Sequence, residues 1–180
     1  MSNLGGSTMS KKALLVIDLQ NDYFEGGAFP LWNTDATLAT IKKAITKANE
    51  TDVPVILIQH VADPNAGISP FFNEGTEGVK IHSEILEVAP HATVVKKAYA
   101  DGFYETNLEE VLSNLGVDEL LVCGMMTQNC VTHTAISKSA EKYKVSILTD
   151  CSTTVNEMIH LIALHAVSTR IALVSSTEVL

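Results

Sequence analysis

The stretch ALLVI at Ala13–Ile17 places five apolar residues in a row, directly before the carboxylate of Asp18. A short, continuous apolar run is typical of a central parallel strand that is buried on both faces. Five further runs of this kind follow, and segments with helical periodicity separate them. They are Val53–Ile58, Val94–Val95, Leu120–Cys123, Val145–Leu148 and Ile171–Val174. This alternation predicts a single α/β domain: a three-layer open sheet of about six mostly parallel strands with helices on both faces.

The segments between the runs predict helices. Thr34 or Asp35 can cap a helix whose apolar face begins at Leu38. Capping-box spacing recurs further along the chain, in the pairs Thr106 with Glu109 and Thr154 with Glu157. In the second of these helices we expect three apolar side chains to face inward, Met158, Ile159 and Ile162. One long helix is expected from about Thr127 to Lys142.

Composition narrows the class of protein. With 180 residues, 46% of them apolar and 18% charged, the chain should fold as one packed domain. The net charge of −9 argues against nucleic-acid or anionic-membrane partners. No apolar run approaches the roughly 18 residues that span a bilayer. Residues 1–10 are expected to be a disordered leader, and residues 11–180 the domain. Three cysteines without disulfide or zinc-pair spacing indicate the reducing cytoplasm.

One long segment lacks any periodicity. Residues 61–80 contain two prolines and three glycines, and loops of this length in compact domains are usually functional or disordered. Phe71 and Phe72 lie inside it. They indicate either a lid over a substrate or simple packing against the surface, and the sequence does not decide between the two.

Three reactive side chains follow three different strands. Asp18 ends the first, Lys97 ends the third, and Cys130 follows the fourth. Because ligands of open parallel sheets bind outside the carboxyl ends of the strands, these side chains should meet at one edge. Each also has a structural interpretation, as a turn residue, a solvated charge or a small buried side chain. The hypothesis of a catalytic site therefore depends on the three together.

Their chemistry is compatible. A thiol at the start of a helix and beside a lysine would be shifted toward the thiolate. A carboxylate could accept the thiol proton and return it to a leaving group. Backbone N–H groups in the turn between Gly124 and Cys130 could bind an oxyanion.

These residues carry a family resemblance. The segments LLVIDLQNDY (14–23), KAYADGFYETNL (97–108) and CGMMTQNCVTHTA (123–135) resemble the three signatures of the isochorismatase-like cysteine hydrolases. The resemblance runs from about residue 12 to 175. The Gly-x-x-Thr-x-x-Cys-Val pattern from Gly124 to Val131 is specific, and the three segments in this order are more so.

The resemblance implies a Rossmann-like fold and a catalytic triad of Asp18, Lys97 and Cys130. Lys97 is favoured over its neighbour because the family lysine lies six residues before a phenylalanine, here Phe103. Asp101 departs from the serine that is common at its position. The resemblance also implies a cis peptide at Met125–Met126 and an oxyanion hole formed by the N–H groups of Met126 and Cys130. A homodimer or homotetramer is expected.

The resemblance also bears on metals and cofactors. Members with nicotinamidase activity hold a metal through an aspartate and two histidines after the second strand. Here that region offers His60 and Asp63, and the next histidine is His82. We therefore predict neither a catalytic metal nor a cofactor. Members that cleave isochorismate typically carry glycine at the nucleophile position, so Cys130 favours acyl transfer.

The sequence thus predicts a metal-independent hydrolase of a small amide, carbamoyl or related C–N bond that works through a Cys130 thioester. Predicted substrate contacts are Gln20, Phe24, His60 and Phe72. Three alternatives stay open: an isochorismatase-type ether hydrolase, a redox-active thiol on the same scaffold, and a ligand-binding module without catalysis.

Overall fold

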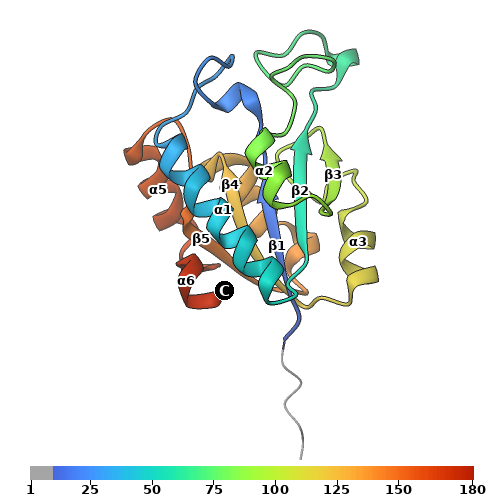
Figure 1. The fold of residues 1–180 in the computed structure, drawn as a ribbon, viewed down its shortest axis with the longest axis vertical. Coiled ribbons are helices and arrows are strands. Elements are labelled where there is room, and N and C mark those ends of the chain that lie inside the picture. The colour runs from blue at the N-terminus through green and yellow to red at the C-terminus, as the bar shows by residue number, and fades with distance from the viewer. Residues whose placement is uncertain (1–9) are drawn as a thin grey trace, which may run out of the picture.

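The computed structural model describes residues 10–180, which form one open sheet between two helical layers (Figure 1). All strand pairs are parallel, and the strand order is β3-β2-β1-β4-β5-β6. The predicted α/β class with about six strands is confirmed. The strands are β1 (Lys12–Ile17), β2 (Val55–His60), β3 (Thr93–Lys97), β4 (Glu119–Met125), β5 (Lys144–Thr153) and β6 (Ala172–Val174).

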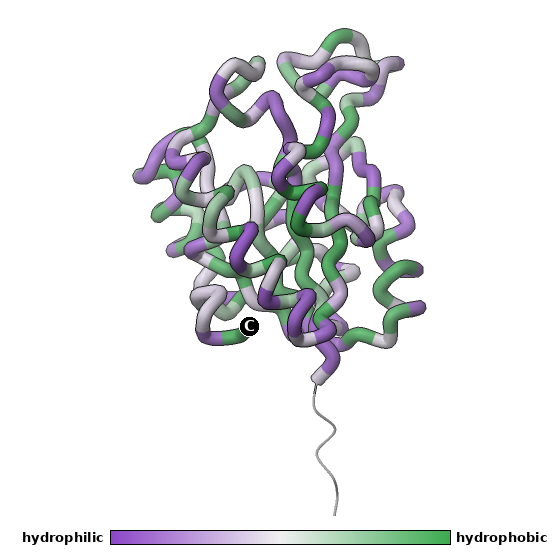
Figure 2. Tube along the Cα trace, viewed as in Figure 1, coloured by the Kyte–Doolittle hydropathy of each residue, from purple (hydrophilic) through white to green (hydrophobic). Residues whose placement is uncertain are grey.

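Two apolar clusters hold the layers together, one on each face of the sheet. Helices α1 (Thr34–Glu50), α2 (Ser83–Val88) and α6 (Ser176–Val179) cover one face. Helices α3 (Leu108–Leu115), α4 (Thr132–Ala135) and α5 (Glu157–Val167) cover the other. Along β1, alternate side chains enter alternate clusters, so the strand is buried on both sides, as its continuous apolar run predicts. In Figure 2 the strands at the centre of the molecule are largely green, the colour of hydrophobic residues.

β1 and β4 come unusually close at their carboxyl ends. Gly124 lies beside Ile17 with φ at 123°, and a Cβ at this glycine would lie 2.1 Å from the Ile17 carbonyl oxygen. Only glycine combines this backbone conformation with this approach. The contact brings the loop after β1 against the loop after β4, which is where the predicted site lies.

The single helix predicted from about Thr127 to Lys142 is wrong. The chain forms a π-helical turn η3 (Thr127–Val131), the short α4, and a 3₁₀ turn η4 (Lys138–Ala140). Two hydroxyl groups have other partners: Thr134 accepts a hydrogen bond from the Gly102 N–H, and Ser137 caps η4 by accepting from the Ser139 N–H. Such side-chain bonds compete with continued helix.

Both predicted capping boxes are also shifted. Asn156 caps α5 in place of Thr154, because its side chain accepts from the Ile159 N–H at 2.9 Å. Asn107 precedes α3, while Thr106 accepts from the Leu108 N–H.

The inward face of α5 differs from the prediction as well. Met158 and Ile162 are 70% and 60% exposed, and Ile159 is partly buried. The buried face consists of His160, Ala163, Leu164 and Val167. Since α5 is apolar nearly all round, its periodicity does not distinguish the two faces.

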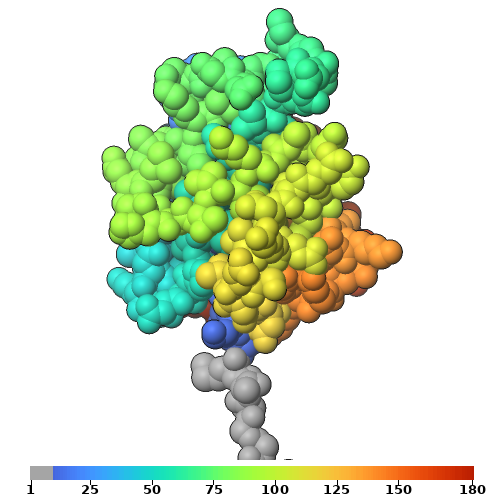
Figure 3. Space-filling view, turned by 90° about the vertical axis from the view of Figure 1, so that its right-hand side faces the viewer, coloured from blue at the N-terminus to red at the C-terminus, as the bar shows by residue number. Residues whose placement is uncertain are grey.

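Residues 61–80 form an irregular loop that includes η2 (Pro64–Ala66) and rises above the carboxyl edge of the sheet (Figures 1 and 3). It is anchored at Asp22, which lies in the 3₁₀ turn η1 (Asn21–Tyr23). The Asp22 carboxylate accepts from the N–H groups of Phe72 at 2.8 Å and Ala28 at 3.0 Å. Gly78 packs so closely on this carboxylate that a Cβ there would overlap it. The loop is therefore fastened to the segment after β1.

The predicted leader lies almost wholly outside the described residues, which begin at Ser10. The Ser10 hydroxyl donates to Glu119 at 2.5 Å. Within residues 10–180, no helix is both long and apolar enough to cross a membrane.

Candidate active site

Asp18 leaves β1 in a left-handed conformation. Its φ is 55°, its N–H donates to the Ile58 carbonyl, and its side chain is fully buried. Aspartate tolerates this region better than most residues, yet the conformation is uncommon and concentrates at functional sites. The turn points the carboxylate away from the strand, toward the edge where β2, β3 and β4 end.

Lys97 ends β3, opposite His60 in the β2–β3 register. Its side chain is buried, and its Nζ lies 3.2 Å from Asp18 Oδ2 and 3.2 Å from Cys130 Sγ. Two more acceptors surround the same ammonium: His60 Nδ1 at 2.8 Å and the Tyr99 carbonyl at 3.0 Å. Lys97 thus lies between the carboxylate and the thiol.

Cys130 lies in η3, just past β4, and only 2% of it is exposed. The turn is closed by the Met126 carbonyl, which accepts from the N–H groups of Asn129 and Val131. The Met125–Met126 peptide is cis, as the family resemblance implies. The oxyanion hole of Met126 and Cys130 N–H groups stays a prediction.

The three side chains that follow different strands do meet. Sγ of Cys130 and a carboxylate oxygen of Asp18 lie within 4.8 Å of each other, with Lys97 bonded to both. One Asp18 oxygen, Oδ1, is buried and has no hydrogen-bond partner among the described residues. Buried carboxylate oxygens normally have a partner. An acceptor left open beside a thiol is suited to take a proton.

The site's electrostatics differ from the expectation for the thiol. Burial raises the pKa of Cys130 and the Asp18 charge raises it further, while Lys97 opposes both. The predicted long helix, whose dipole would favour thiolate, is absent. Burial also raises the pKa of Asp18, against the lowering effect of Lys97. The resting site therefore holds a neutral thiol beside a carboxylate that is more basic than an exposed one.

The four predicted substrate contacts fall into different environments. Gln20 is fully buried, and its amide donates to the carbonyls of His60 and Val79 and accepts from the His60 N–H. The amide hydrogens of Gln20 therefore hold the end of β2 and the loop at Val79. Phe24 is buried against His82, with ring centroids 4.5 Å apart. His60 and Phe72 lie at the site, His60 bonded to Lys97 and Phe72 packed 5.8 Å from the His60 ring.

Tyr23 is a site residue that the sequence reasoning missed. Its buried ring packs edge-on against Phe72 with centroids 4.6 Å apart. Burial raises the pKa of its phenol, and the charges of Asp18 and Cys130 raise it further. An aromatic residue five positions after Asp18 was the available signal.

Within residues 10–180, His60, Asp63 and His82 do not come together as a group of metal-binding side chains. The Asp63 carboxylate caps η2, and His82 caps α2 through Nδ1. Among residues 10–180, the group that could hold a metal ion is Asp18, His60 and Cys130. The Lys97 ammonium lies within 3.2 Å of all three, so a cation already occupies the centre of this group.

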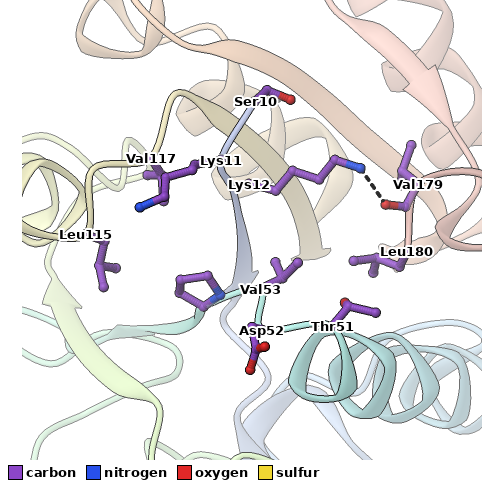
Figure 4. A pocket seen from close by; sticks show the side chains of 11 residues that line it. Ser10, Lys11, Lys12, Thr51, Asp52, Val53, Leu115, Val117, Val179 and Leu180 are labelled. Atoms are coloured by element: carbon purple, nitrogen blue, oxygen red, sulfur yellow. Dashed lines mark hydrogen bonds between the residues drawn. The ribbon is translucent and has the colours of Figure 1, made fainter. Parts of the chain in front are cut away.

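A separate hollow of about 440 Å³ lies at the amino ends of the strands (Figure 4). Lys12 crosses it and donates to the Val179 carbonyl at 2.9 Å. Its other walls include Val53, Leu115 and Val117. The described lining contains no cysteine and no histidine, whereas the carboxyl edge brings Cys130, Asp18, Lys97 and His60 together.

An open parallel sheet with a cysteine, an aspartate and a lysine at its carboxyl edge is the arrangement of a cysteine hydrolase of the α/β class. The isochorismatase domain profile matches residues 12–179, and the chain belongs to the isochorismatase family of hydrolases. The uncharacterized isochorismatase family protein YddQ of Bacillus subtilis is 38% identical over 143 residues, which cover 79% of this chain and 78% of YddQ.

Two further relatives place the chain in this family. Nicotinamidase 3 of Arabidopsis thaliana is 32% identical, over 82% of this chain and 76% of that protein. The crystal structure of an isochorismatase-like hydrolase from Alkaliphilus metalliredigens superposes with a TM-score of 0.84 at 25% identity, covering 94% of this chain and 96% of that one. The predicted family and fold are confirmed.

Proposed function

We propose that this protein is a metal-independent amidohydrolase that cleaves a C–N bond of a small amide, carbamoyl or related compound. The observation that carries the proposal is the Lys97 ammonium, 3.2 Å from Cys130 Sγ and 3.2 Å from Asp18 Oδ2 in a buried site. This geometry suits a thiol that is neutral at rest and loses its proton as it attacks. The name of the Arabidopsis relative, a nicotinamidase, agrees with amide chemistry.

The reaction divides into two halves. Asp18 takes the thiol proton as Cys130 Sγ bonds to the substrate carbonyl carbon, and backbone N–H groups of Met126 and Cys130 hold the oxyanion. The protonated Asp18 then gives its proton to the leaving nitrogen, the C–N bond breaks, and a thioester remains. Water attacks the thioester after losing a proton to Asp18. The carboxylic acid departs, and the proton returns to Cys130.

The three alternative functions fit the site less well. A redox-sensing thiol needs a low pKa and exposure to solvent, whereas Cys130 is buried and burial raises its pKa. Isochorismatase-type ether cleavage leaves no role for Cys130 as a nucleophile. A ligand-binding module leaves the open Asp18 oxygen without a use.

Intact-mass spectrometry during turnover tests the proposal. We expect an acyl adduct on Cys130 with at least one compound from a panel of small amides, carbamates and ureas, and none on Cys130→Ala. Cys123→Ala is the matched control, because this buried cysteine packs in the apolar cluster on the other face of the sheet from Cys130 and should leave the adduct intact. Release of product without any adduct on Cys130 would reject the covalent mechanism.

Metal removal gives a second test of the same proposal. Because Lys97 occupies the centre of the Asp18, His60 and Cys130 group, we expect turnover to survive EDTA at full rate. The measurement is the rate before and after chelation, with zinc and iron added back separately. Loss of turnover that either metal restores would show that a metal takes part.

A further inference from the structure

His60 offers the Lys97 ammonium its shortest hydrogen bond. Nζ lies 2.8 Å from His60 Nδ1, compared with 3.0 Å to the Tyr99 carbonyl and 3.2 Å to both Asp18 and Cys130. An ammonium has three hydrogens, and four acceptors surround this one. The hydrogen bonded to His60 is therefore withheld from the carboxylate and the thiol.

The His60 ring is suited to accept at this nitrogen. Burial lowers the pKa of His60 to about 4, and the Lys97 charge adds to the effect, so the ring is neutral at neutral pH. Because an ammonium can only donate, Nδ1 has to be the unprotonated nitrogen, and the ring proton lies on Nε2.

The backbone of His60 is fixed from two sides. The Gln20 amide accepts from its N–H and donates to its carbonyl, each at 2.8 Å. The β2–β3 register places the residue opposite Lys97. These bonds fix the main chain from which the ring projects, and Phe72 packs beside the ring with centroids 5.8 Å apart.

Resting on the proposed function, we propose that His60 is a positioning residue that draws one Lys97 hydrogen away from Asp18 and Cys130. The acceptor is Nδ1, and the result is that Asp18 keeps an open oxygen for the thiol proton. Without this acceptor the ammonium would bond more fully to the carboxylate and the thiol. Asp18 would become a weaker base, and Cys130 would ionise more readily without substrate.

The pH profile of Cys130 alkylation by iodoacetamide tests this without any substrate. In His60→Ala the profile should shift about one pH unit lower, so that alkylation below the thiol pKa is about tenfold faster. Its kcat toward any amide substrate should fall, with KM little changed. The other charged groups at the thiol, Asp18 and Lys97, are both still present in the variant, and Tyr23 stays protonated because burial raises the pKa of its phenol.

Two isosteric variants decide which ring nitrogen matters. The amide oxygen of His60→Asn can take the place of Nδ1, whereas the amide of His60→Gln reaches the place of Nε2. We expect Asn to keep the wild-type profile and Gln to behave like Ala. If His60→Ala does not fold, the Asn and Gln variants alone decide.

An unshifted profile in Ala and Gln, or the same shift in Asn and Ala, would overturn the positioning role. Failure of the proposed function is a separate result. In that case the profile shifts as expected, but no amide, carbamate or urea acylates Cys130.

Discussion

Asp18 experiences two opposite influences on its pKa: burial raises it, and Lys97 lowers it. The same carboxylate raises the pKa of Cys130 through its charge. Asp18 thus suppresses the thiolate at rest and, in the proposed mechanism, carries the proton during turnover. Suppression of the thiolate and proton transfer during turnover can be separated by experiment, because loss of the Asp18 charge should favour the thiolate but stop the proton transfer.

Asp18→Asn should therefore lose turnover and gain alkylation. Acid–base contributions of about 10²–10⁴ disappear from each step that needs them. At the same time, removal of a negative charge lowers the pKa of Cys130, so iodoacetamide labelling at neutral pH should be faster. Rates of turnover and labelling, measured on the same preparation, check this. If both fell together, Asp18 would be the proton acceptor even without substrate.

Cys130→Ser should fail in a different way. The serine hydroxyl has a much higher pKa than a thiol, so the same carboxylate activates it poorly. Turnover should fall by several orders of magnitude while substrate still binds, which calorimetry can measure. Turnover that stayed unchanged in both this variant and Asp18→Asn would favour the binding-module alternative.

Protonation of His60 should make the stability of the protein depend on pH. The pKa of its side chain is 6.5 in an unfolded chain and about 4 in the folded protein. Between pH 6.5 and pH 4 the unfolded state binds a proton at His60 that the folded state does not bind. The contribution of His60 to the free energy of unfolding is therefore present above pH 6.5 and is lost as the pH falls toward 4. We expect the urea midpoint to drop less between pH 7 and pH 5 in His60→Asn than in the wild type. His91→Asn, at an exposed histidine, is the control and should match the wild type.

The residues of the triad could be predicted from sequence because parallel strands end at one edge, and Asp18, Lys97 and Cys130 each lie at or just past such an end. The charge state of Cys130 could not be predicted from the sequence. It depends on how deeply the thiol is buried, and that depth results from long-range packing of separate loops. Tyr23 was missed for the same reason, since its contact with Phe72 joins segments about 50 residues apart.

Among the elements, strands were predicted better than helices, for a physical reason. A run such as Ala13–Ile17 identifies a strand locally, because burial on both faces demands consecutive apolar residues. The break in residues 127–142 depends on distant partners: Thr134 bonds to Gly102, and Ser137 donates to Asp101. No local pattern contains this information.

The contact between β1 and β4 yields a prediction at the scale of elements. Gly124→Ala would place a methyl group 2.1 Å from the Ile17 carbonyl, at a φ of 123°. The two central strands would have to separate, so we expect a loss of more than about 3 kcal/mol in the free energy of unfolding. Gly67→Ala is the matched control. It has a similar positive φ, 92°, but nothing lies within 4 Å, so backbone strain of about 1–3 kcal/mol is the whole cost.

Urea unfolding of both variants provides the measurement. Equal losses would mean that strain at positive φ accounts for both, and that the strands tolerate the methyl group. A Gly124→Ala protein that fails to fold, next to a folded Gly67→Ala, would agree with the expectation. In either case the Gly67→Ala control separates the cost of the close contact with Ile17 from the cost of a positive φ.

At the scale of the whole molecule, α5 presents an unpartnered apolar face. Met158, Leu161 and Ile162 are 70%, 55% and 60% exposed. Beside them lies a hollow of about 470 Å³ with Ile136, Ala166 and Arg170 among its walls. Gln128, two residues before Cys130, also lines this hollow. Exposed apolar patches of this kind usually mark interaction surfaces.

We propose that a second copy of the chain covers this face, which keeps the sequence-based prediction of a homo-oligomer. An interface there would abut the turn that carries Cys130, so assembly and activity should be coupled. Leu161→Glu should give monomers in sedimentation equilibrium at micromolar concentration, with unchanged circular dichroism and reduced turnover. Leu86→Glu is the control, because Leu86 is 45% exposed on α2, on the opposite face of the sheet, and should leave assembly intact. A monomeric wild type, or equal dissociation by both variants, would count against α5 as the interface.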